Sequence, residues 1–372
     1  MIYFDNAATS RGKPECVLQA YMDYVKDIGV SPGRGSYELA IQASRMLHQS
    51  RKAVASFFKS QSKANVVFTK NSTEAINLFL NGFLSPGDHV LISCYEHNAV
   101  LRPMQTLKNA GIIDFTVLPE KTIYAPEKDL HSFIRPTTKL AVITYASNLT
   151  GQYVYHRNLG MLLHESNIAV MVDASQGAGG GKINMANDYI DYLAFTGHKD
   201  LLALPGVGGL CSNEPLTFPP LLQGGTGIHG EEYTNPQIFP EGYEAGTLNM
   251  PAIWALKAAI EYIQANTASL RDKASMLMKT LIQGLYTCPK VKVYNPNHER
   301  VTTFCFNVEG YSSSDVVQIL AENEICVRGG IHCAILAHET LNTVETGAVR
   351  ISLNHANTIE EVNRFLSVIG GL

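Results

Sequence analysis

Residues 168–176 read IAVMVDASQ, and residues 189–199 read YIDYLAFTGHK. Each stretch begins with a short apolar run of the kind that forms a buried strand. Asp173 ends the first run, and Lys199 follows the second. A charged side chain in such a place is costly without a partner. The two stretches therefore predict consecutive strands that bring Asp173 and Lys199 to one edge of a sheet.

The same kind of run recurs through the middle of the chain. Two segments with helical spacing come first, at 18–28 and 39–57. Each later apolar run is bounded by turn residues, and helical spacing returns between most of them. The predicted strands are 64–69, 89–93, 112–118, 139–145, 168–173, 189–196 and 207–211. This alternation predicts an α/β fold with a mostly parallel sheet that helices cover on both faces.

The alternation stops after residue 211. Residues 215–251 contain many prolines and glycines, over a length that is typical of a functional or interface loop. A helix is predicted after Pro251, and a second, long helix is predicted near 268–286.

Short strands and helices are predicted for the rest of the chain. Thr358 and Glu361 have the spacing of a capping box, which would open a last amphipathic helix. We divide the chain near residue 251 into a large domain, 15–250, and a small domain made of 1–14 and 251–372.

Composition narrows the function classes. Of the 372 residues, 45% are hydrophobic and 17% are charged, which favours two folded domains and argues against disorder. A net charge of -4 argues against a basic surface for nucleic acid or membranes. The seven cysteines form no C-x-x-C pair, which argues against a disulfide framework or structural zinc site. We expect a cytoplasmic protein with no metal, no signal peptide and no membrane span.

Polar residues follow several predicted strands, where a ligand binds in an open parallel sheet. Residues 70–74 read KNSTE and open a helix, so free N–H groups and the hydroxyls of Ser72 and Thr73 suit a phosphate. An ordinary helix cap explains the same residues when they are taken alone. His97 and the turn at 147–151 also follow strands, and each has an ordinary structural explanation.

Three of these features belong together. A lysine for a Schiff base, a carboxylate for a pyridinium nitrogen and a phosphate cup are what pyridoxal phosphate needs from a protein. Lys199, Asp173 and the helix start at 70–74 supply them in one chain. Each feature is unspecific alone, but their combination and order indicate a site for this cofactor.

With these residues identified, the sequence resembles the class V aminotransferase superfamily of fold-type I pyridoxal-phosphate enzymes. Within it, the chain is similar to the cysteine desulfurases and selenocysteine lyases. The resemblance extends from residue 3 to Arg350, and its motifs stand in family order. They are YFDNAAT at 3–9, NSTEAIN at 71–77, EHNAV at 96–100, VDASQ at 172–176, TGHK at 196–199, EAGT at 244–247 and RGGIHCA at 328–334.

The resemblance implies a fold and a cofactor site. The fold would have a large domain with a mostly parallel, mixed seven-stranded sheet and a smaller α+β C-terminal domain. Lys199 would bind pyridoxal 5'-phosphate covalently, Asp173 would pair with its ring nitrogen, and Gln176 would contact its phenolic oxygen. His97 would stack on the ring and move protons. The phosphate would be bound by Ser72, Thr73, Thr196 and His198, and by Thr247 from the partner in a homodimer.

The resemblance also implies a substrate site and a reaction. Asn148, beside the cofactor, would bind the substrate carboxylate together with Arg350, with Arg328 nearby. Cys333 would be the nucleophile that takes sulfur from L-cysteine as a persulfide and leaves L-alanine. Its reactive form is the thiolate, toward which His332 and Arg328 would contribute positive charge. A sulfur-acceptor protein would be a further partner.

Other interpretations remain open. A class V aminotransferase or a selenocysteine lyase would use the same scaffold, and a pyridoxal-phosphate-binding sulfur-relay protein would bind without turnover. Taken by position alone, Cys333 is equally well explained as a buried free thiol. The sequence also departs from the family pattern, because Ala203 stands where glycine is commoner and Ile335 stands where proline is common. Residues 225–230 match G-x-G-x-x-G, but prolines flank them instead of a strand and a helix.

Overall fold

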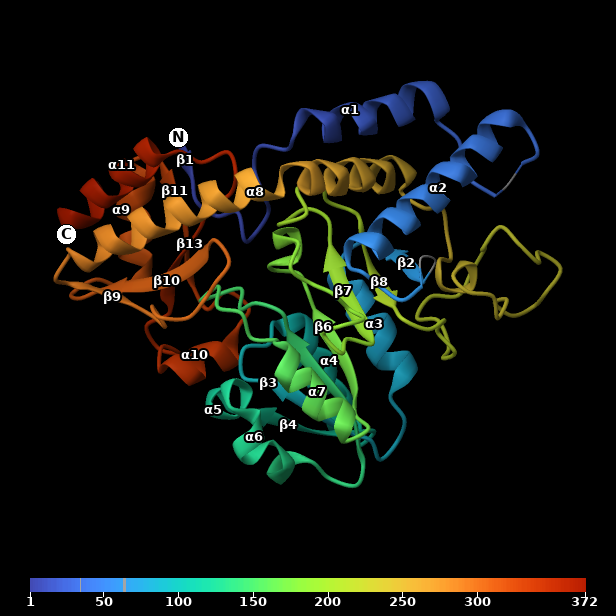
Figure 1. Cartoon of the computed structure of the whole chain (residues 1–372), viewed down its shortest axis with the longest axis horizontal. Helices are drawn as coiled ribbons and strands as arrows, with labels where there is room; N and C mark the ends of the chain where they lie inside the picture. Colours follow the sequence, from blue (N-terminus) through green and yellow to red (C-terminus); the bar gives the residue numbers. More distant parts are fainter. Residues whose placement is uncertain (34, 63–64) are drawn as a thin grey trace.

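The computed structural model describes residues 1–33, 35–62 and 65–372, and a seven-stranded sheet lies at its centre (Figure 1). The strand order is β2-β8-β7-β6-β5-β3-β4. Strands β7, β6, β5, β3 and β4 are parallel, whereas β8 is antiparallel to both β7 and β2. The strands are β2 (Val66–Thr69), β3 (His89–Ser93), β4 (Asp114–Leu118), β5 (Thr138–Thr144), β6 (Ala169–Asp173), β7 (Tyr192–Thr196) and β8 (Gly208–Ser212). The predicted mostly parallel, mixed sheet is confirmed.

Every predicted strand is found, with small shifts of its ends. The predicted run at 189–196 becomes a strand only from Tyr192, because Tyr189 has a φ of 59° and forms a turn. The first predicted strand starts later than 64, and residue 64 lies outside the described residues. Strand ends are set by turns and pairing partners, which an apolar run does not reveal.

Helices cover both faces of the sheet, as the alternation predicts. Side chains alternate between the faces, so that Leu91, Ala141 and Val172 join one core cluster while Val90 and Val142 join another. The first cluster is packed by α1 (Glu15–Asp23), the π-helix η1 (Tyr24–Ile28), α2 (Glu38–Phe57), α7 (Arg157–Glu165) and the first half of α8 (Met250–Tyr286). The second is packed by α3 (Ser72–Phe83) and α4 (Asn98–Asn109). Short helices complete this part of the chain: α5 (Glu120–Tyr124), α6 (Pro126–Asp129), η2 (Leu130–Phe133) and η3 (Ala178–Gly180).

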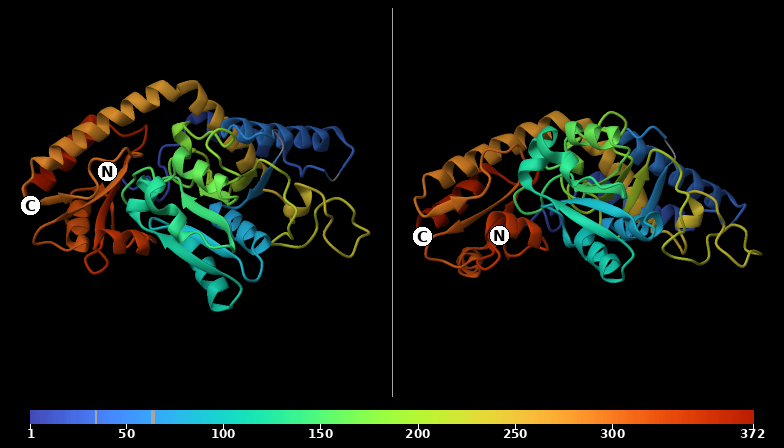
Figure 2. Two further views of the ribbon diagram at one scale, coloured as in Figure 1. Left: turned by 60° about the horizontal axis from the view of Figure 1, so that its bottom comes forward. Right: turned by 90° about the horizontal axis from the view of Figure 1, so that it is seen from below.

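Helix α8 is one helix of 37 residues, where the sequence predicts two (Figure 2). Pro251 occupies its first turn, where a missing N–H costs nothing, and Asn249 caps the backbone N–H of Ala252. Its apolar residues up to Ile263 join the large-sheet cluster, whereas those from Leu277 on join a third cluster. The apparent break in the sequence is therefore a change of packing partner along one continuous helix.

The third cluster belongs to a smaller, antiparallel sheet of order β12-β13-β10-β9. Strand β1 pairs in parallel with β11, so the first residues lie with this C-terminal part. The predicted capping box of Thr358 and Glu361 is confirmed at the start of α11. The elements are β1 (Ile2–Tyr3), β9 (Val291–Val293), β10 (Thr303–Val308), α9 (Ser313–Glu322), β11 (Ile325–Cys326), β12 (Arg328–Gly330), α10 (Ile335–Leu341), β13 (Ala348–Ser352) and α11 (Ile359–Gly370). The domain division near residue 251 stays a prediction, and α8 begins at this place, at Met250.

The segment between β8 and α8, which we call the arm (residues 213–249), projects from the body of the molecule (Figures 1 and 2). Its only regular element is the short helical turn η4 (Glu241–Tyr243), and every arm residue is among those described. It exposes the large apolar side chains Leu221, Leu222, Tyr233 and Ile238. Within the described residues, no helix is long and apolar enough to cross a membrane.

Candidate active site

The carboxyl edge of the large sheet surrounds a cavity of about 190 Å³. Strands β5, β6 and β7 end at this cavity, with Thr144, Asp173 and Thr196 as their last residues, and α3 begins there with Ser72. Its lining comprises Asn71, Ser72, Thr73, His97, Thr144, Asn148, Asp173, Ser175, Gln176, Thr196, His198 and Lys199. The structure thus brings together the residues predicted for the cofactor, apart from Thr247.

Lys199 and Asp173 lie on consecutive strand ends, as their sequence positions suggest. Loss of water around its amine lowers the pKa of Lys199, and nearby Arg350 lowers it further, while the charge of Asp173 raises it only in part. Asp173 is 2% exposed. Its Oδ1 accepts hydrogen bonds from the backbone N–H (2.9 Å) and the hydroxyl (2.5 Å) of Ser175. An amine with a lowered pKa is more readily uncharged, which suits it to act as a nucleophile or base.

The start of α3 and the end of β7 form a cup of hydroxyl and N–H groups. Asn71 Oδ1 accepts the N–H of Glu74 (3.0 Å), which fixes the first turn of the helix. The hydroxyl of Ser175 lies 2.7 Å from that of Ser72 and connects the cup to Asp173. The hydroxyl of Thr196 is buried and has no hydrogen-bond partner among the described residues. Such an orphaned group is costly, and an anion at the helix start would satisfy it.

Two histidines at the cavity are held in the uncharged state. Burial lowers the pKa of His97 to about 4, and burial together with nearby lysines lowers that of His198 to about 4. His97 caps α4, with its Nδ1 accepting the N–H of Ala99 (3.0 Å). The carbonyl of His198 accepts the N–H of Ser10 (2.9 Å), which attaches the N-terminal segment to the site. A neutral His97 ring can lie against another ring without the cost of burying a charge.

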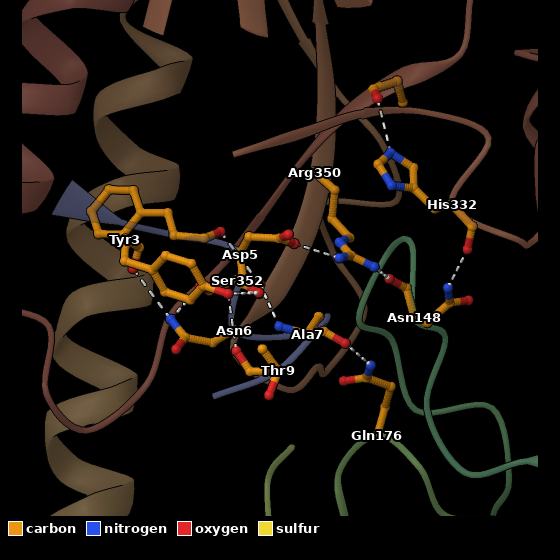
Figure 3. Close-up of polar contacts among 12 residues, drawn as sticks. Tyr3, Asp5, Asn6, Ala7, Thr9, Asn148, Gln176, His332, Arg350 and Ser352 are labelled. Atoms are coloured by element: carbon orange, nitrogen blue, oxygen red, sulfur yellow. Dashed lines mark hydrogen bonds and ion pairs between the residues drawn. The ribbon is translucent and has the colours of Figure 1, made fainter. Parts of the chain in front are cut away.

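The N-terminal segment also contacts Gln176 (Figure 3). The side-chain amide of Gln176 donates a hydrogen bond from Nε2 to the carbonyl of Ala7 (2.9 Å). Its Oε1 is buried and finds no partner in the described parts of the chain. With the Thr196 hydroxyl, this makes a second unsatisfied polar atom on the cavity wall, so the lining is suited to a polar guest.

Arg350 on β13 reaches the edge of this site from the small sheet (Figure 3). The guanidinium is buried and donates to Asp5 Oδ1 (2.6 Å) and to the carbonyl of Asn148 (3.1 Å). Asn148 Nδ2 donates in turn to the carbonyl of His332 (2.7 Å). Arg350 Nε and Asn148 Oδ1 are buried without a partner among the described residues. Arg328, which is exposed, lies directly opposite Arg350 in the strand register, so two cationic side chains are neighbours at this edge.

Cys333 lies on a separate groove of about 440 Å³, which shares Thr73 and His97 with the cavity. His332 and Cys333 both have left-handed φ angles, 53° and 56°, a conformation that non-glycine residues rarely adopt. The surroundings fix this strained turn, because Asn98 N–H donates to the carbonyl of Cys333 (2.8 Å) and the ring of His332 bonds the carbonyl of Ala348 (2.9 Å). The turn leaves Cys333 partly exposed.

The expectation that His332 contributes positive charge is wrong. Its side chain is 3% exposed, and burial lowers its pKa to about 3, with the charge of Arg350 as a second cause. The ring is therefore neutral at physiological pH and serves to hold the turn. Of the two residues predicted to supply positive charge near Cys333, only Arg328 remains, and it is exposed.

Thr247 lies outside the cavity of its own chain. It is exposed and lines a neighbouring hollow with Lys70 and Glu74, next to the start of α3. Its predicted role at the phosphate of a partner subunit stays a prediction.

Three further site residues carry no role in the sequence interpretation. Ser175 bridges Ser72 and Asp173, Thr144 ends β5 at the cavity, and Asp5 pairs with Arg350. Thr144 could be found from its place at a strand end. Asp5 could not, because its partner is 345 residues away.

Comparisons with known proteins agree with this geometry. The family model described as "Aminotransferase class-V" matches residues 2–365. A "Probable cysteine desulfurase" of Methanothermobacter thermautotrophicus is 32% identical, covering 97% of this chain and 92% of that protein. One from Synechocystis sp. is 30% identical over 98% of this chain and 89% of that protein. The solved apo structure of a cysteine desulfurase from Thermococcus onnurineus NA1 matches this chain with a TM-score of 0.89 at 31% identity. The match covers 100% of this chain and 94% of that one.

Proposed function

This chain belongs to the class V aminotransferase family, and from that premise we propose that it is a pyridoxal-phosphate-dependent cysteine desulfurase. It would convert L-cysteine to L-alanine and hold the sulfur as a persulfide on Cys333. The observation that carries the proposal is one shared wall. His97 and Thr73 line both the cavity that contains Lys199 and Asp173 and the groove that contains Cys333.

The cavity residues fit the cofactor. The start of α3 and the hydroxyls of Ser72 and Thr196 would bind the phosphate, since the Thr196 hydroxyl lacks a partner among the described residues. Asp173 would pair with the ring nitrogen, Lys199 would bond to the aldehyde, and His97 would lie against the ring. Gln176 would contact the phenolic oxygen of the ring, and its Oε1 has no partner among the described residues.

When bound, pyridoxal phosphate supplies an electron sink that makes the Cα proton of an amino acid acidic. Arg350 would bind the substrate carboxylate, with Asn148 and Arg328 beside it, which aims Cα at Lys199. Lys199, whose pKa is lowered mainly by burial, would take the Cα proton.

Cys333 would then act on the substrate sulfur. Its sulfur bonds to the substrate sulfur while the bond from that sulfur to Cβ breaks, and the electron pair stays with the carbon skeleton, which becomes alanine after protonation. The turn that holds Cys333 faces the groove, so the outer sulfur of the persulfide would be open to an acceptor.

A homodimer is part of the proposal. Thr247 is exposed at the end of the arm and does not line the cavity of its own chain, so it would reach the phosphate of a second copy. The exposed apolar residues of the arm would be covered in that dimer. A sulfur-acceptor protein and a cytoplasmic location, where a reducing environment keeps Cys333 free, complete it.

Incubation of the purified protein with L-cysteine tests the function. We expect alanine in solution and persulfide on the protein, and pyruvate with amino-group transfer would instead indicate an aminotransferase. The matched controls are Cys333→Ser and Cys326→Ser, of which only the first removes the proposed nucleophile. Equal alanine production by wild type and Cys333→Ser would overturn the persulfide assignment.

A further inference from the structure

A buried ion pair joins α2 to the base of the arm. Both oxygens of Glu244 bind the guanidinium of Arg51, with Nη1 at 2.7 Å from Oε1 and Nη2 against Oε2. The two side chains are only 7% and 4% exposed. A pair in this geometry fixes the direction of both side chains, because a guanidinium and a carboxylate meet in one plane.

The pair also holds strand β2. Glu244 Oε1 accepts the backbone N–H of Phe68 (2.6 Å), and Arg51 Nη1 donates to the carbonyl of Val66 (2.6 Å). The guanidinium lies over the ring of Phe68, 5.1 Å from its centre. β2 leads directly into α3, whose first residues form the phosphate cup. One side of this cluster thus supports the cup of its own chain, and the other side holds the arm.

Glu244 lies close to Thr247 along the arm. Thr247 lies three residues further along the chain, so its Cα is at most about 10 Å from that of Glu244. The intervening Gly246 has a φ of 96°, which only glycine adopts readily, and its N–H bonds the carbonyl of Gly225 (2.9 Å). The course of the chain at Thr247 is therefore fixed on one side by Glu244 and on the other by the start of α8, where Asn249 Nδ2 donates to the carbonyl of Gly206 (3.3 Å).

Stability alone does not account for this pair. Moving two charges out of water is costly, and well-packed apolar residues often serve a buried site equally well. The arm has little regular structure of its own to fix its course, so a directional anchor at its base is what a residue such as Thr247 requires.

We propose that Arg51 and Glu244 are a positioning pair that aims Thr247 at the cofactor phosphate of a second copy of the chain. The proposal rests on the proposed function, because it takes the homodimer and the cofactor from there. A glutamine at position 244 keeps an oxygen that can accept the N–H of Phe68, so the support of β2 in its own chain is retained. The distinguishing consequence of Glu244→Gln is therefore an effect on the site of the partner and not on the site of its own chain.

Hybrid dimers test this consequence. Two differently tagged chains are co-expressed, and dimers carrying both tags are purified. One hybrid has Lys199→Ala and Glu244→Gln together on one chain, and the other has Lys199→Ala on one chain and Glu244→Gln on its partner. Each is loaded with pyridoxal phosphate, dialysed and reduced with borohydride, so that only cofactor at the remaining Lys199 is fixed and counted by mass.

We expect the first hybrid to lose cofactor about tenfold faster than a hybrid with Lys199→Ala alone, since one hydrogen bond to a charged phosphate is lost. The second hybrid should match that control. Adding Thr247→Ala to the Glu244→Gln chain should give no further acceleration. Faster loss only in the second hybrid, in both hybrids equally, or in neither would overturn the proposal.

Folding and dimer formation need their own control. Glu244→Gln leaves Arg51 without a counter-charge, so Arg51→Met with Glu244→Gln is made in parallel, which leaves no unpaired charge. If the wild-type protein is monomeric in solution, the positioning proposal is overturned. Failure of the proposed function is recognised separately, because borohydride then fixes no cofactor on Lys199 even in the wild-type protein.

Discussion

The cavity at the strand ends and the groove that holds Cys333 share a wall but are built in opposite ways. The cavity is lined by groups whose pKa values burial lowers, among them Lys199, His97 and His198. The groove is open, and Cys333, its proposed nucleophile, is partly exposed on a strained turn. Chemistry on a bound cofactor benefits from excluding water, whereas handing on a sulfur atom requires access. The structure separates these needs and leaves His97 between them.

The largest effect is expected from a substitution in the cavity that leaves the groove unchanged. Lys199→Ala removes both the covalent attachment and the base, so desulfuration should fall by about 10⁵-fold, near the cost of losing a nucleophile. Borohydride reduction followed by mass measurement should find no fixed cofactor, whereas Lys52→Ala, on exposed α2 surface, should behave as wild type. Cofactor fixed to the Lys199→Ala protein would refute the assignment.

The next largest effect is expected from a substitution in the groove that leaves the cavity unchanged. Cys333→Ser should lower persulfide formation by at least about 10³-fold, because a hydroxyl does not replace the thiolate as a sulfur nucleophile. Cofactor binding should remain within twofold of wild type by spectrophotometric titration. If the variant lost its cofactor as well, the two regions would not be separable as described.

A smaller change sharpens the description of the cavity. Thr196→Val removes a buried hydroxyl that has no partner among the described residues. Cofactor affinity should fall about tenfold, while the cofactor-free protein should gain about 1 kcal/mol in free energy of unfolding, since an unsatisfied group is gone. Chemical denaturation and cofactor titration measure the two quantities. A loss of both would place the hydroxyl in an internal hydrogen bond instead.

The last expected effect concerns pH and the turn that carries His332 and Cys333. Folding lowers the pKa of His332 from 6.5 to about 3. Between these values the unfolded chain binds a proton that the folded chain does not, so stability is full above pH 6.5 and falls as the pH drops. The contribution is about 1.4 kcal/mol per pH unit within this window.

Denaturant unfolding between pH 4 and 7 measures this slope. His332→Gln should reduce it by about one proton, whereas His131→Gln, at an exposed position, should leave it unchanged. An unaltered slope in His332→Gln would mean that the ring is not buried as a neutral group.

The sequence predicts some parts of this molecule better than others. The presence of the strands and the placement of Asp173 and Lys199 after neighbouring parallel strands could be read from local patterns, because a buried strand and the turn after it are contiguous in the chain. The neutral state of His332 could not, because its burial depends on residues from β13 and α10. The pairing of Asp5 with Arg350 likewise depends on how the first and last parts of the chain meet.

The continuity of α8 is a further feature that local reading misses, and it has a consequence for how the two sheets are joined. A helix of 37 residues is about 55 Å long, and its only proline and glycine, Pro251 and Gly284, lie near its ends. Its first half packs in the core of the large sheet and its second half in the core of the small sheet, so one continuous helix connects the two. Arg350, on β13, and Lys199, which follows β7, are therefore carried by two sheets that share this helix.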